Sequence, residues 1–145
     1  MFADLLKRLT APAPEQLPAT DARLALTALL VRVARSDGQY DTDEQGRILA
    51  IASARYGLSD ADARSLRAEA EELEAQAPDT VRFTRAIKDA VPYEDRLSVI
   101  EALWKVVLAD GVRAQEEGAL LRLVASLLGV TDQDSARARQ KVASE

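Results

Sequence analysis

The chain of 145 residues contains no cysteine and no histidine, and only 4% of its residues are aromatic. Without cysteine it forms no disulfide and offers no thiol nucleophile. Without histidine it lacks a Ser-His triad, and without both residue types it lacks the usual ligands of a zinc site. Any bound metal must therefore be held mainly by oxygen ligands, which favours a hard cation such as Ca²⁺, Mg²⁺ or Mn²⁺.

Proline and glycine are also scarce, with five and six residues, whereas alanine, leucine, arginine and glutamate dominate and favour helix. The formal net charge of −5 argues against a nucleic acid partner, because phosphate binding needs a basic face. No apolar run approaches the roughly 20 residues of a transmembrane helix. These features predict a soluble, all-α domain, and the cytoplasm is the expected location.

Residues 1–19 are predicted to form a short helix and a proline-rich linker. Four apolar residues share one face of that helix: Phe2, Leu5, Leu6 and Leu9. The start of the chain is too short and too charged for a signal peptide. A peripheral membrane anchor and a terminal helix that packs on the domain are alternatives for this segment, and its small apolar area favours the second.

Residues 20–145 are predicted to form a compact helical bundle of about seven helices. Helical spacing and turn residues delimit the segments 21–36, 42–57, 59–77, 80–90 and 92–110, then one that ends at Gly129 and a last one. The expected N-caps are Thr20, Thr42 (with Gln45 in a capping box), Ser59 and Thr131. The charged run from Arg67 to Glu74 is interpreted as a solvated face, and Trp104 as a core residue.

One acidic motif occurs twice. An apolar helical run stops at Asp37-Gly38 and again at Asp110-Gly111, and a glutamate, Glu44 or Glu117, stands seven residues after each aspartate. A matching segment of the form Gly-apolar-Ser/Thr-Asp follows further along in both copies, at 57–60 and 129–132. The repetition predicts two related helical halves, at about 24–77 and 92–145.

Two interpretations of this motif are open. If the halves pack with twofold pseudo-symmetry, Asp37, Glu44, Asp110 and Glu117 converge, and a divalent cation would relieve the repulsion among their carboxylates. Alternatively the aspartates accept hydrogen bonds from the following helix, and the glutamates complement its dipole. The spacing alone favours this second, structural interpretation. The motif is not an EF-hand, because Thr42 stands at the glycine position of that loop.

The paired motif resembles the TerB-like family of tellurite-resistance proteins. Asp37-Gly38 and Asp110-Gly111 match the helix-ending motifs of that family, and Glu44 and Glu117 match its acidic helix starts. The resemblance covers roughly residues 24–134. It implies an all-helical domain linked to tellurite and chemical-stress responses, which binds metal through acidic residues and acts with partner proteins. It therefore adds support for a cation site.

Three functions compete. The first is a non-enzymatic, metal-binding module of the TerB-like type, with protein partners and no nucleic acid. The alternative is a protein-interaction scaffold in which the acidic residues are helix caps. The third is an enzyme that uses paired carboxylates, which the scarcity of aromatic residues and the lack of a phosphate-binding loop disfavour. We therefore expect no catalytic residues.

Overall fold

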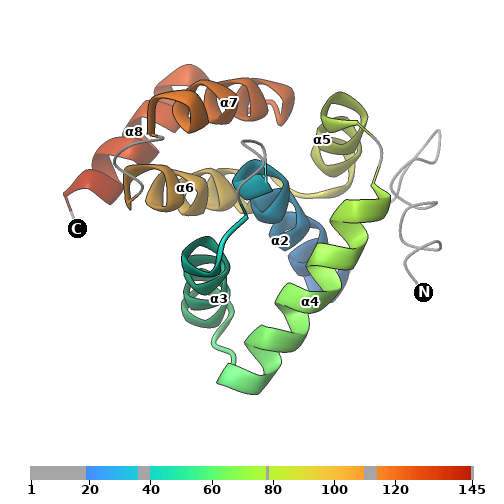
Figure 1. Cartoon of the computed structure of the whole chain (residues 1–145). Helices are drawn as coiled ribbons and strands as arrows, with labels where there is room; N and C mark the ends of the chain where they lie inside the picture. The colour runs from blue at the N-terminus through green and yellow to red at the C-terminus, as the bar shows by residue number, and fades with distance from the viewer. Residues whose placement is uncertain (1–18, 36–39, 78, 110–113, 145) are drawn as a thin grey trace.

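The computed structural model describes residues 19–35, 40–77, 79–109 and 114–144, and these form seven α-helices without strands (Figure 1). Their bounds, in chain order, are α2 (Ala19–Arg35), α3 (Thr42–Tyr56), α4 (Asp60–Gln76), α5 (Thr80–Ala90), α6 (Tyr93–Ala109), α7 (Ala114–Leu127) and α8 (Asp132–Ala143). The predicted all-α fold is confirmed. The predicted helix within residues 1–19 lies outside the described residues.

Helix α2 is the centre of the domain. Residues on every side of it have no exposed surface, including Ala25, Leu29, Val31 and Val33. A helix with buried apolar residues on every side is surrounded by other helices, and α2 contacts α3, α4, α5, α6 and α7. Each large aliphatic side chain buried in this way contributes about 1.5–3 kcal/mol.

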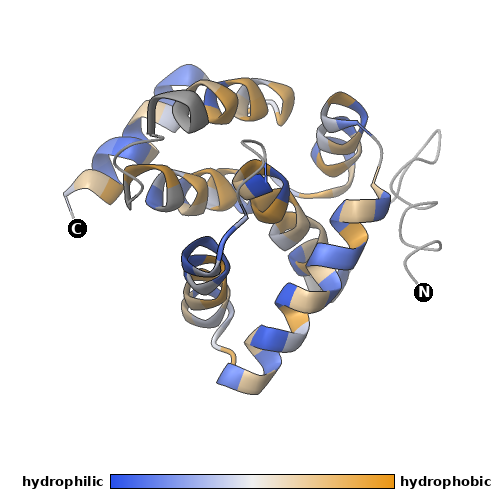
Figure 2. Cartoon of the chain, in the orientation of Figure 1, coloured by the Kyte–Doolittle hydropathy of each residue, from blue (hydrophilic) through white to orange (hydrophobic). Residues whose placement is uncertain are grey.

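The other helices surround α2. Figure 1 shows α3 and α4 on one side of it, α6, α7 and α8 on the other, and α5 beside the end of α4. The most extensive helix pairings are α2 with α4 and α6 with α8. In Figure 2 apolar colour marks the mutually facing sides of α2, α6 and α7, whereas α4 carries many hydrophilic positions. Trp104 of α6 is a core residue, as predicted, with 3% of its surface exposed.

Two helix ends follow the turn chemistry that the sequence predicts. Gly57 and Gly129 have positive φ values of 62° and 73°, which favour glycine. After each glycine, Ser59 or Thr131 caps the next helix through its side-chain oxygen, which accepts a hydrogen bond from the backbone three residues on. The two predicted matching segments therefore have the same local structure. The duplication of the whole halves stays a prediction.

The surroundings of the two glycines differ. A Cβ atom added at Gly57 would meet nothing within 4 Å. At Gly129 it would lie 2.9 Å from Cε of Lys88 and 3.2 Å from Nη1 of Arg96. Arg96 is itself held in place, because its guanidinium donates to the backbone oxygens of Val91 and Leu128. Glycine at position 129 therefore has two roles: it allows the turn, and it lets side chains of α5 and α6 pack closely against the end of α7.

Two predicted N-caps are wrong. Thr20 is the second residue of α2, which begins at Ala19. For α3 the cap is Asp41, whose backbone is extended and whose Oδ1 accepts a hydrogen bond from the N–H of Glu44 at 2.9 Å. Thr42 is already helical, so it is not in the conformation that a cap requires.

The predicted capping box at α3 is also wrong. Gln45 lies one position beyond the third residue of α3, where such a box would need it. Its amide Nε2 donates instead to the backbone oxygen of Tyr40, at 3.3 Å. The cap at this helix start is therefore Asp41, and neither Thr42 nor Gln45 has the predicted role.

Candidate functional site: the acidic helix corners

The structure describes only some of the four predicted metal ligands. Asp37 and Asp110 lie outside the described residues. Glu117 is the fourth residue of α7, but its side chain is outside the described part of the structure. Glu44 is the third residue of α3 and is described in full. Both glutamates therefore begin a helix, as the spacing predicts, and the convergence of all four carboxylates stays a prediction.

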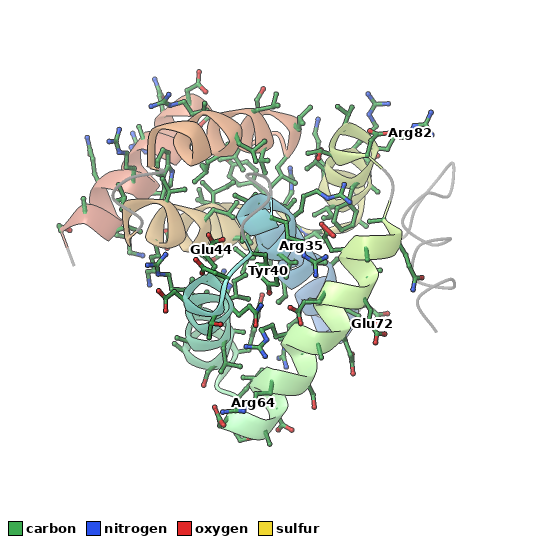
Figure 3. All side chains as sticks on the ribbon, in the orientation of Figure 1. Arg35, Tyr40, Glu44, Arg64, Glu72 and Arg82 are labelled. Carbon is green, nitrogen blue, oxygen red and sulfur yellow. The ribbon has the colours of Figure 1, made fainter. Side chains whose placement is uncertain are left out.

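Glu44 differs from the other acids of its helix turn. Its side chain is completely buried, whereas Asp41 and Asp43 are exposed. Figure 3 labels Glu44 at the start of α3, the helix that packs against both α4 and α6. Removing a carboxylate from water costs several kcal/mol unless donors or a cation meet it. A surface glutamate placed only to complement the helix dipole would not need to be buried.

The cap at Asp41 bears on the structural interpretation of the motif. In that interpretation, an aspartate before Gly38 would accept hydrogen bonds from the first turn of the next helix. The N–H of Glu44 in that turn is instead satisfied by Asp41. Asp41 therefore satisfies one backbone donor of the first turn of α3.

Within the described ranges, no three or more Asp, Glu, His or Cys side chains gather closely enough to hold a metal ion. The exposed acids of α4 are thus not an alternative cluster. A site with three or more such side chains would therefore have to include residues outside the described ranges, and the repeated acidic motif at 36–39 and 110–117 contains such residues.

A half-buried tyrosine that the sequence did not single out, Tyr40, lies just before Asp41, the N-cap of α3. Tyr40 packs beneath the guanidinium of Arg35, whose Cζ lies 4.9 Å from the ring centre. Burial raises the pKa of the Tyr40 hydroxyl well above its ordinary value, and the nearby carboxylate of Glu71 raises it further, while the charges of Arg67 and Arg35 oppose the shift. The start of α3 is therefore coupled to charged groups of α2 and α4.

Polar contacts join the same corner to α4. Arg67 of α4 donates from Nη1 to the backbone oxygen of Gln45 at 3.4 Å, and its Nε lies 4.0 Å from Oε1 of Glu71. The first of these contacts joins the start of α3, next to Glu44, to α4. The sequence shows Arg67, but an arginine within a charged run does not indicate which group it contacts.

The interpretation of the 67–74 run as wholly solvated is wrong at its end. Glu74 is 8% exposed and lies between two arginines of α2. Its Oε2 is 3.1 Å from Nη1 of Arg35, and its Oε1 is 3.6 Å from Nε of Arg32. Arg32 also donates from Nη2 to the backbone oxygens of Glu74 and Ala77, at 3.1 and 3.5 Å, which satisfies carbonyls at the end of α4.

The described residues thus form an all-helical domain with a buried carboxylate at one helix corner. Its sequence matches the family model of tellurite resistance protein TerB over residues 23–140, and the chain belongs to this family. The chain has no match among curated proteins or among solved structures. No helix in the described ranges is long and apolar enough to cross a membrane.

Proposed function

We propose that this domain is a non-enzymatic module that binds a divalent cation, Ca²⁺, Mg²⁺ or Mn²⁺, through Asp37, Glu44, Asp110 and Glu117. Membership in the TerB family supports a role in the response to tellurite or chemical stress. The observation that carries the proposal is the complete burial of Glu44 at the start of α3. A cation bound there would offset the cost of holding a carboxylate away from water.

The chemistry of the chain is consistent with such a module. With no cysteine or histidine, the side chains that can ligate a metal are mainly oxygen donors, as Ca²⁺ and Mg²⁺ prefer. The proposed module works in the cytoplasm, since no disulfide calls for an oxidising compartment. In this proposal the metal-bound form of the module binds a protein partner.

A scaffold that binds proteins without a cation is the alternative. Exposed large apolar side chains favour it, namely Val81 on α5, Leu108 on α6 and Leu123 on α7, with 46%, 36% and 52% of their surfaces exposed. In that case the acids of the motif only stabilise helix ends. Substituting them would then lower stability by about 0.5–2 kcal/mol and would have no cation-dependent effect.

Calorimetric titration of metal-stripped protein with Ca²⁺, Mg²⁺ and Mn²⁺ tests the proposal. We expect saturable binding by the wild type, and its loss in the Asp37→Asn/Asp110→Asn double variant and in Glu44→Gln. Asp43→Asn is the matched control, because Asp43 precedes Glu44 but is exposed. Circular dichroism confirms that each variant folds. Absence of heat with all three cations would reject the metal site and favour the scaffold.

A further inference from the structure

A cavity lies between α2 and α7, at the place where α4 ends and α5 begins. Its volume is about 270 Å³. That is just below the roughly 300–1,000 Å³ of pockets that hold drug-sized ligands, so it suits a smaller molecule. Seven residues line it: Arg32, Val33, Arg35, Glu74, Thr80, Leu120 and Val124. None of them belongs to the repeated acidic motif.

One wall of the cavity is cationic. Two arginines line it against a single acid, Glu74, so its described lining carries one net positive charge. Arg35 is the more accessible of the two, with 35% of its side chain exposed against 17% for Arg32. A guanidinium has five N–H donors, and the contact from Nη1 to Glu74 uses one of them. Figure 3 shows Arg35 in the space between α2 and α4.

Another part of the lining forms an apolar wall. Val33 and Val124 are buried core residues beneath it, and Leu120 is partly buried and packs against the core. The hydroxyl-bearing Thr80, the first residue of α5, also belongs to the lining. A ligand that matches this cavity needs an anionic end for the arginines and a short aliphatic end for Leu120.

We propose that this cavity binds a small organic monoanion, a carboxylate with a short aliphatic chain. The carboxylate accepts hydrogen bonds from Arg35, and its chain lies against Leu120, above the buried Val33 and Val124. An inorganic anion would leave the apolar wall unused, and a neutral alcohol would leave the positive charge uncompensated. The cavity shares no residue with the proposed metal site, so the two proposals can be tested separately.

Methyl-detected NMR titration with hexanoate, on protein freed of metal with a chelating resin, tests this site. We expect saturable millimolar binding that shifts the methyl signals of Val33, Leu120 and Val124. At equal concentrations 1-hexanol, hexylamine and inorganic phosphate should shift them far less. Unshifted methyl signals up to the solubility limit of hexanoate would overturn the proposal, as would equal shifts with 1-hexanol or hexylamine.

Two variants separate charge from volume. Arg35→Gln should weaken hexanoate binding at least about tenfold, since a hydrogen bond to a charged group is typically worth that factor or more. Leu120→Phe leaves every charge in place and should weaken binding by filling the cavity, so it decides the matter if Arg35→Gln fails to fold. Arg82→Gln, on the exposed face of α5, should bind as the wild type does. Wild-type affinity in Leu120→Phe would refute the site.

Discussion

Replacing Glu74 with glutamine should destabilise the domain far more than any substitution of an exposed glutamate. Glu74 is 8% exposed and is paired with both Arg32 and Arg35. Removing one partner of a buried ion pair typically costs about 3–5 kcal/mol, because the remaining charge stays buried. The cost here should be nearer 2–3 kcal/mol, below that range, because water reaches Arg35 and glutamine keeps one acceptor oxygen.

Urea denaturation followed by circular dichroism measures this loss. With a slope of about 2 kcal/mol per molar urea, the midpoint should fall by about 1–1.5 M. Glu72→Gln is the matched control, since Glu72 lies on the same helix and is exposed (Figure 3). Its free energy of unfolding should change by no more than about 0.5 kcal/mol. If Glu74→Gln changes stability as little as Glu72→Gln does, the pairing of α2 with α4 does not depend on this carboxylate.

Three further predictions concern local structure. Gly129→Ala should cost more free energy of unfolding than Gly57→Ala, because both glycines have positive φ but only the former is crowded; equal losses in urea denaturation would contradict this. Asp41→Ala should cost about 0.5–2 kcal/mol in the same assay and Thr42→Ala much less, since Asp41 is the cap, and the reverse order would be inconsistent with the structure. Burial raises the pKa of Tyr40, so its neutral form is favoured in the folded state. The free energy of unfolding should therefore fall as pH rises above about 10. The fall should be less steep in Tyr40→Phe.

The features that the sequence predicted correctly are those that depend on local chemistry. Helix α5 has the predicted bounds, Thr80–Ala90. Gly57 and Gly129 end helices in the left-handed conformation that glycine tolerates, and Ser59 and Thr131 cap the helices that follow. Each of these signals is contained within a few consecutive residues. A glycine two residues before a short hydroxyl residue can be recognised without any knowledge of the tertiary structure.

The errors arose where neighbouring residues compete or where the partner is remote. Asp41 and Thr42 are both good caps, and the sequence does not indicate which enters the helical conformation first. Glu74 follows Ala70 and Leu73 on the inward face of α4, but its burial depends on arginines that lie 39 and 42 residues earlier in the chain. Local charge patterning cannot identify such a partner.

The candidate site was partly accessible from the sequence. The repeated spacing correctly placed Glu44 and Glu117 in the first residues of α3 and α7. It did not indicate that Glu44 is completely buried, because helical spacing predicts the direction of a side chain and not how closely other helices pack against α3. The polar contacts from Arg67 and Arg35 around Tyr40 were likewise unpredicted, since they join three helices.

The most direct test of the proposed metal site is the paramagnetic broadening of backbone amide NMR signals by Mn²⁺ at substoichiometric amounts. The proposal predicts selective loss of the signals of residues 36–44 and 110–117, with recovery when excess Ca²⁺ or Mg²⁺ displaces the Mn²⁺. It also predicts no selective loss in the Asp37→Asn/Asp110→Asn variant. Uniform weak broadening, or broadening centred on the exposed acids Glu69 and Glu72 of α4, would contradict a cation site at the repeated acidic motif.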